Sequence, residues 1–152
     1  MLVSAALGAL ALLVASPALA QHRGPGLRAG ASADPDQFYI GAHWISTPLV
    51  EQFRFQPNLE VGIGSDLTLV AVNLEFAYWV PLPNRDWNVY IGGGPALNTY
   101  MFDEDRFGDR DTELEGGVNL LVGLAHDQGL LFEFKVGLID SPEVKVGVGF
   151  TF

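Results

Sequence analysis

The sequence of 152 residues contains no cysteine. Disulfide bonds, thiol catalysis and cysteine-ligated metal sites are therefore excluded. Basic residues are also few, because 8 Lys and Arg stand against 18 Asp and Glu, and the formal net charge at pH 7 is −10. A surface of that sign repels phosphate, so we expect neither a nucleic acid nor an anionic lipid surface as a partner.

The apolar run over residues 2–14 is shorter than the roughly 20 residues that a membrane-spanning helix needs. Ala18-Leu19-Ala20 then supplies the small-x-small pattern that precedes signal peptidase cleavage, although no Lys or Arg precedes the run. The sequence predicts a signal peptide over residues 1–20 and a mature chain that begins at Gln21. An uncleaved N-terminal anchor helix is the alternative interpretation.

Residues 21–36 are rich in Gly, Pro and Ala and show no periodicity, which predicts a flexible N-terminal tail. From Gln37 onward the apolar residues recur at every second position, the period of a β-strand. Turn residues separate the alternating segments, and no segment has the pattern of an amphipathic helix. Seven strands can be phased in this way, over 37–45, 51–63, 67–80, 87–102, 112–125, 129–139 and 143–152.

The two faces of these strands differ in an unusual way. One face is a continuous band of Val, Leu, Ile and Phe, whereas the other is mainly Gly and Asn with single charges. A water-soluble barrel or sandwich would carry many charged residues on its outer face. An apolar face toward lipid and a small-residue face toward a narrow lumen explain both patterns. We therefore predict one all-β domain over 37–152, an antiparallel up-and-down transmembrane β-barrel.

Aromatic residues gather near the predicted strand ends, as in the interfacial girdles of membrane barrels. These residues are Tyr78, Trp79, Trp87, Tyr100, Phe102, Phe150 and Phe152.

Two segments carry a specific resemblance. The chain ends with an alternating strand, residues 144–152, whose last residue is Phe152, and residues 87–95 read WNVYIGGGP after a short polar turn. The first resembles the C-terminal strand of outer-membrane barrels, and the second is similar to the Gly-rich strand of small barrels of the OmpA and OmpX type, apart from Pro95. The resemblance implies an outer-membrane location, outer-membrane lipid around the barrel, and Phe150 and Phe152 as the signal that the barrel assembly machinery reads.

Single-chain barrels of this kind have an even number of strands, and both termini face the periplasm. The eighth strand must come from a break near Pro57, from a break near residues 93–95, or from the tail. Counting back from a periplasmic Phe152 places the turns 140–142, 103–111 and 64–66 outside the cell.

Charged residues on the inward face predict a polar network that plugs the lumen, because the interior of an eight-stranded barrel is only wide enough for side chains. We expect cross-lumen pairs such as Arg54 or Lys145 with Glu75 or Glu133, since a buried charge needs a partner. Asn58, Asn73, Asn98 and Asn119 share this face. The full set of predicted charged residues is Arg54, Glu60, Glu75, Glu115, Glu133, Lys135 and Lys145.

No catalytic, cofactor or metal site is recognisable. The acidic stretch 103–111 fails as a calcium loop, because Phe107 and Leu114 stand where oxygen ligands are required. The His-x-Ser pair of outer-membrane lipid A deacylases is absent, and His43 is interpreted as a hydrogen-bonding residue of the lumen. We expect a monomeric barrel with a structural or interaction role; a lipid-modifying enzyme with an unrecognised site is the alternative.

Overall fold

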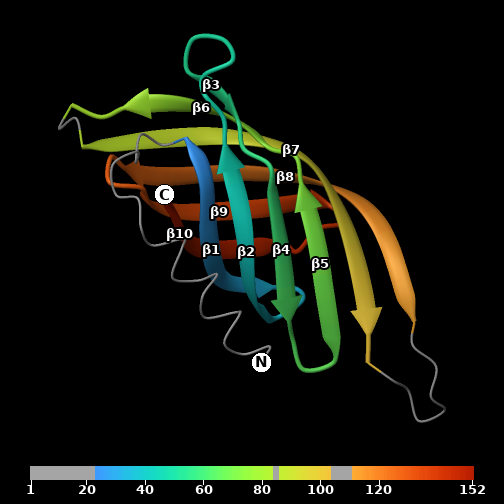
Figure 1. Cartoon of the computed structure of the whole chain (residues 1–152). Helices are drawn as coiled ribbons and strands as arrows, with labels where there is room; N and C mark the ends of the chain where they lie inside the picture. The colour runs from blue at the N-terminus through green and yellow to red at the C-terminus, as the bar shows by residue number, and fades with distance from the viewer. Residues whose placement is uncertain (1–22, 84–85, 104–110) are drawn as a thin grey trace, which may run out of the picture.

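The computed structural model describes residues 23–83, 86–103 and 111–152, so the predicted signal peptide lies outside the described residues. The described chain is built from β-strands (Figure 1). Among the described residues, no helix is long and apolar enough to cross a membrane. The strands are β1 Gly24–Ala33, β2 Gln37–Ile45, β3 Phe53–Phe55, β4 Asn58–Ile63, β5 Leu67–Asn73, β6 Phe76–Pro81, β7 Trp87–Phe102, β8 Thr112–His126, β9 Leu130–Ile139 and β10 Val144–Thr151.

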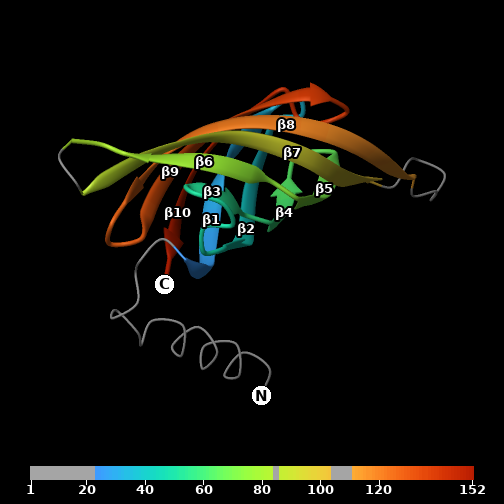
Figure 2. The same cartoon turned by 90° about the horizontal axis from the view of Figure 1, so that it is seen from above.

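The sheet closes on itself because the first and last strands pair. β1 and β10 are antiparallel neighbours from Gly26 opposite Thr151 to Ala33 opposite Val144. The Phe152 backbone N–H extends this pairing by donating to the Pro25 carbonyl oxygen at 3.0 Å. β7 and β8 lie on one side of the resulting barrel, and β1 and β2 lie on the other (Figure 2). Among the described strands, each one except the short β3, which pairs only with β6, therefore has a strand neighbour on both sides.

Two of the barrel strands are interrupted, which explains how ten segments form an eight-stranded barrel. β3 and β4 are separated by Gln56 and Pro57, and β5 and β6 by Leu74 and Glu75. The two interruptions lie side by side, because the Gln56 N–H donates to the Glu75 carbonyl oxygen at 2.8 Å. β7 runs past both halves, pairing with β5 and with β6. The two breaks therefore interrupt two long strands, and they do not add a further strand to the barrel.

All seven phased strands are confirmed, whereas the prediction of a flexible tail over residues 21–36 is wrong for residues 24–33. These residues form β1, the eighth strand, which lies between β2 and β10. The domain therefore begins at Gly24 and not at Gln37. Gly and Ala occupy most positions on both faces of β1, so the hydrophobic contrast that reveals period two is weak there. Backbone pairing on both sides overrides the low strand propensity of Gly and Ala.

The strand phases place the apolar band outside. Phe38 is 80 % exposed and Ile40 is 66 % exposed, while their neighbours Gln37 and Tyr39 on β2 are buried. The same alternation continues around the wall, for example with Phe132 and Phe134 outward on either side of buried Glu133. The structure is thus inverted relative to a water-soluble barrel, with its polar residues in the lumen.

Glycines of the inner face make room for large side chains. The ring of Tyr90 lies over Gly123 of β8, where an added Cβ would fall on the phenol, whereas Gly116 of β8 has open space. We expect Gly123→Ala to lower the free energy of unfolding by about 1–3 kcal/mol, because the ring must move. Gly116→Ala is the matched control. Denaturant midpoints in detergent micelles measure both, and equal shifts would contradict this packing role for Gly123.

Candidate functional site: the barrel lumen

Six charged residues meet in the middle of the lumen, and they are between 0 % and 7 % exposed. Three are cations and three are carboxylates, so the group carries no net formal charge. Charges removed from water require partners of opposite sign and hydrogen bonds, which this composition supplies. We call this group the charged cluster, and its members are Arg28, Glu60, Glu75, Glu133, Lys135 and Lys145.

Arg28 on β1 and Lys145 on β10 form ion pairs with carboxylates of the charged cluster. Nη1 of Arg28 lies 2.9 Å from Oε1 of Glu133 and 3.2 Å from Oε1 of Glu60. Nζ of Lys145 lies 2.5 Å from Oε2 of Glu60 and 5.2 Å from the centre of the Tyr39 ring. Glu60 on β4 is therefore paired with cations of the first and the last strand, β1 and β10.

Lys135 on β9 lies between three carboxylates. Its Nζ is 2.8 Å from Oε1 of Glu75 and 3.2 Å from Oε1 of Glu133. The third carboxylate oxygen, Oε1 of Glu60, lies 3.3 Å away. The Lys135 side chain is 2 % exposed, so its ammonium group is a buried cation that three carboxylates share.

A row of asparagines connects the cluster to β8. Nδ2 of Asn119 donates to Oδ1 of Asn73 at 2.8 Å, and Nδ2 of Asn73 donates to Oδ1 of Asn58 at 2.7 Å. Nδ2 of Asn58 then donates to Oε2 of Glu75 at 2.7 Å. Asn73 and Asn58 each accept one hydrogen bond and donate the next, so buried polar groups of three strands are satisfied together.

An apolar layer lies between the charged cluster and the end of the barrel where β1 begins and β10 ends, here called the terminal end. Trp79 and Tyr90 stack at its centre with ring centroids 4.7 Å apart. Trp79 is 2 % exposed, so its predicted place in an outer aromatic girdle is wrong. The apolar layer comprises Ile45, Ala77, Trp79, Tyr90, Leu121, Ala125 and Leu131.

Two residues predicted for the network lie outside the charged cluster. Arg54 is half-buried near the terminal end, with its guanidinium carbon 4.8 Å from the centre of the Trp79 ring. Glu115 is half-buried near the opposite end of β8, opposite Asn98. The expected pairings also differ, because Lys145 contacts Glu60 and not Glu75 or Glu133. The other five predicted residues meet in the cluster.

Sequence reasoning missed Arg28, because the tail prediction removed its segment from the phasing. Its signal was present in the sequence. Arg28 shares one face of the segment with Gly26 and Gly30, whereas Leu27 and Ala29 lie on the other face. Glycines with a single charged residue are the inward pattern of the other strands.

The lumen offers a second, smaller polar contact at the terminal end. Nε2 of His43 lies 2.9 Å from Oγ1 of Thr151, and both side chains are buried. Within the described ranges, no group of three or more His, Asp or Glu is arranged to hold a metal ion. Residues 104–110 of the acidic stretch lie outside the described residues.

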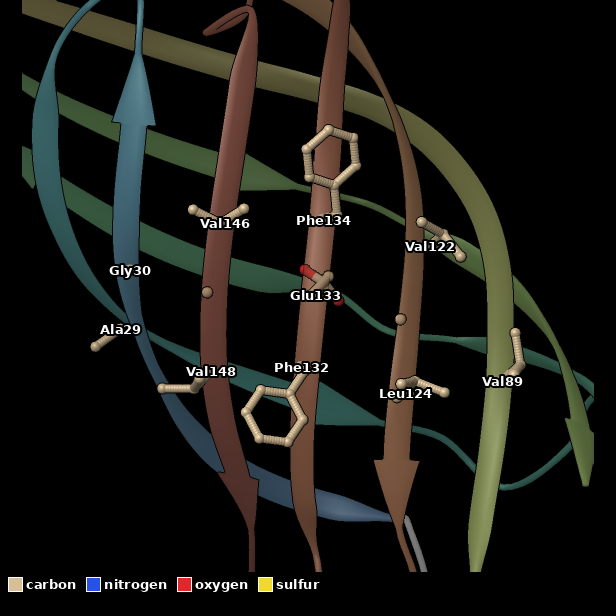
Figure 3. Close-up of a pocket in the computed structure, with 12 residues that line it drawn as sticks. Ala29, Gly30, Val89, Val122, Leu124, Phe132, Glu133, Phe134, Val146 and Val148 are labelled. Atoms are coloured by element: carbon tan, nitrogen blue, oxygen red, sulfur yellow. The ribbon is translucent and has the colours of Figure 1, made fainter. Parts of the chain in front are cut away.

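The outer wall of the barrel carries exposed apolar side chains on β9 and β10. Figure 3 shows Phe132 and Phe134 on β9 with Val146 and Val148 of β10 beside them. These side chains line a shallow hollow on the outside of the barrel. At the terminal end, the rings of Phe150 and Phe152 meet edge to face with centroids 5.8 Å apart.

Two solved structures share this fold. The N-terminal β-barrel domain of Pseudomonas aeruginosa OprF matches with a TM-score of 0.58 and 14 % identity, over 84 % of this chain and 96 % of that chain. Neisserial surface protein A (NspA) matches with a TM-score of 0.52 and 14 % identity, over 84 % of this chain and 93 % of that chain. No protein-family model and no curated protein matches the sequence. The likeness confirms the predicted eight-stranded barrel.

Proposed function

We propose that this chain is a small outer-membrane barrel with a structural or interaction role and a lumen that its own side chains keep closed. The observation that carries the proposal is the inversion of the fold: a continuous apolar wall outside and a neutral cluster of six buried charges inside. In water such a wall would be an aggregation hazard, whereas lipid would cover it. A neighbour in fold is named as a surface protein, which supports a location in the cell envelope.

The closed lumen is supported by the way its side chains meet. Three cations and three carboxylates touch one another across the middle of the barrel, so none of them needs bulk water as a partner. A small hollow beside the cluster, lined by Gln37, Tyr39 and Glu60 among others, has no room for a water molecule. The interior of an eight-stranded barrel is only about wide enough for its own side chains to fill.

The orientation and the partners form part of the same proposal. With the terminal end in the periplasm, the turns 34–36, 64–66 and 140–143, the end of β7 and the start of β8 face the outside. Outer-membrane lipid surrounds the apolar wall, and the barrel assembly machinery recognises the last strand through Phe150 and Phe152. The barrel works as a monomer, and its outer turns are the contact surface for any interaction.

Fractionation of cells that produce the full chain tests the location. We expect the protein only in the detergent-extracted outer-membrane fraction, with N-terminal sequencing that begins at Gln21. A folded barrel should also migrate differently on a gel before and after boiling. Recovery from a soluble periplasmic extract would contradict the proposal, and an intact Met1 would contradict the predicted cleavage.

The lipid A profile of cells with and without the protein separates a structural role from the enzyme alternative. An unchanged profile is the expected result. A change in acylation that depends on the protein would overturn the structural role in favour of a lipid-modifying activity.

A further inference from the structure

The apolar layer crosses the lumen separately from the charged cluster. Its members come from β2, β6, β7, β8 and β9, which is most of the circumference at the terminal end. On the remaining side, His43 and Thr151 meet each other over Gly26, where an added Cβ would fall on the imidazole. The cross-section at this level is thus filled by side chains that the charged cluster does not include.

The polar edges of the layer are satisfied from within the protein. Nε1 of Trp79 donates to Oε1 of Gln56 at 3.2 Å, and the Tyr90 hydroxyl donates to Oε2 of Glu133 at 2.8 Å. Leu121, Ala125 and Leu131 complete the layer with aliphatic surface, and they are 1 % to 3 % exposed. An ion that enters among the aliphatic and aromatic side chains of the layer would lose its hydration shell, because the polar groups at the edges already pair with one another.

We propose that the lumen is closed by two seals in series, the charged cluster and the apolar layer, and that either seal alone stops ions. The proposal rests on the closed lumen proposed above and assigns that closure to two separate sets of residues. A hydrogen bond from Tyr90 to Glu133 joins the seals, so the two layers are adjacent but chemically distinct. Loss of ion pairs in the cluster therefore leaves the barrel closed.

Planar-bilayer recordings of four purified proteins test this division. They are the wild type, Glu75→Ala/Lys135→Ala, Trp79→Ala/Tyr90→Ala, and the combination of all four changes. The Glu75 and Lys135 pair is chosen because its removal leaves two cations and two carboxylates in the cluster. We expect no steady current from the first three proteins and a steady current from the fourth.

Each result has a distinct meaning. Steady current through the wild type would overturn the closed lumen itself. A silent wild type with current through either double variant would overturn the proposal of two independent seals, but not the proposal of a closed lumen. A refolded but silent combined variant would also overturn them, because the seals would then lie elsewhere.

A second measurement applies if the combined variant does not refold. Hydrogen exchange of the tryptophan indole N–H groups is followed by NMR in detergent micelles, with outward Trp44 and Trp87 as internal references. In Glu75→Ala/Lys135→Ala, a dry apolar layer should keep exchange at Trp79 at least about tenfold slower than at Trp44 and Trp87. Exchange of Trp79 as fast as Trp44 in this variant would overturn the proposal.

Discussion

Replacing Lys135 by methionine is expected to lower the free energy of unfolding by about 3–5 kcal/mol, the cost of breaking a buried ion pair by removing one partner. The ammonium group lies within 3.3 Å of three carboxylates, and its removal leaves two cations in the cluster, Arg28 and Lys145, against those three carboxylates. Methionine fills a similar volume, so the loss reports charge and not a cavity. Denaturant unfolding in detergent micelles measures it.

A double variant separates the ion pairs from general damage to the lumen. Lys135→Met/Glu75→Gln restores the balance of two cations and two carboxylates, so it should recover part of the loss. The surface variant Glu113→Gln is the control for a carboxylate outside the cluster, and its effect should stay within about 0.5 kcal/mol. A double variant that is as unstable as the sum of its single variants would contradict the coupling of Lys135 and Glu75.

Replacing Phe152 by aspartate is expected to reduce the amount of protein in the outer membrane to a small fraction of the wild-type level. The proposed reason is recognition of the terminal aromatic residue during assembly. Phe152→Tyr keeps an aromatic ring and should assemble normally. Immunoblots of isolated outer membranes measure both variants against the wild type.

Recognition must be distinguished from barrel stability, because Phe152 also pairs with Pro25 and contacts the Phe150 ring. The aspartate variant should therefore be refolded in detergent from denaturant. Normal refolding together with failed assembly in cells is the expected combination. Normal outer-membrane levels of Phe152→Asp would contradict the role of the terminal residue.

The face of each strand could be predicted from the sequence, but the depth of each side chain along the lumen could not. Period two places Arg54 and Glu115 inward, and both do belong to the inner side of their strands. Their depth depends on how far each strand is staggered against its neighbours, which the alternation does not specify. For this reason the cluster contains Lys135 and Lys145, whereas Arg54 and Glu115 lie nearer the two ends of the barrel.

β1 shows a second reason why the prediction was incomplete. Its inner positions are Gly26, Arg28 and Gly30, and its outer positions include Ala29 and Ala31, so hydrophobicity hardly changes from one position to the next. Backbone pairing with β2 and β10 holds the segment as a strand, although its own residues do not show the strand pattern. The missing strand and the missing cation Arg28 therefore have one cause.

The contact between the apolar wall and lipid is the central claim, and spin labelling tests it most directly because the chain has no native cysteine. Single cysteines at the outward positions Ile40, Phe134 and Val148, and at Glu113 as the control, carry the label in protein reconstituted into lipid vesicles. At the three wall positions, relaxation by oxygen, which concentrates in lipid, should exceed relaxation by a water-soluble paramagnet. Glu113 should show the opposite order. Strong relaxation of Ile40, Phe134 and Val148 by the water-soluble paramagnet would contradict the account.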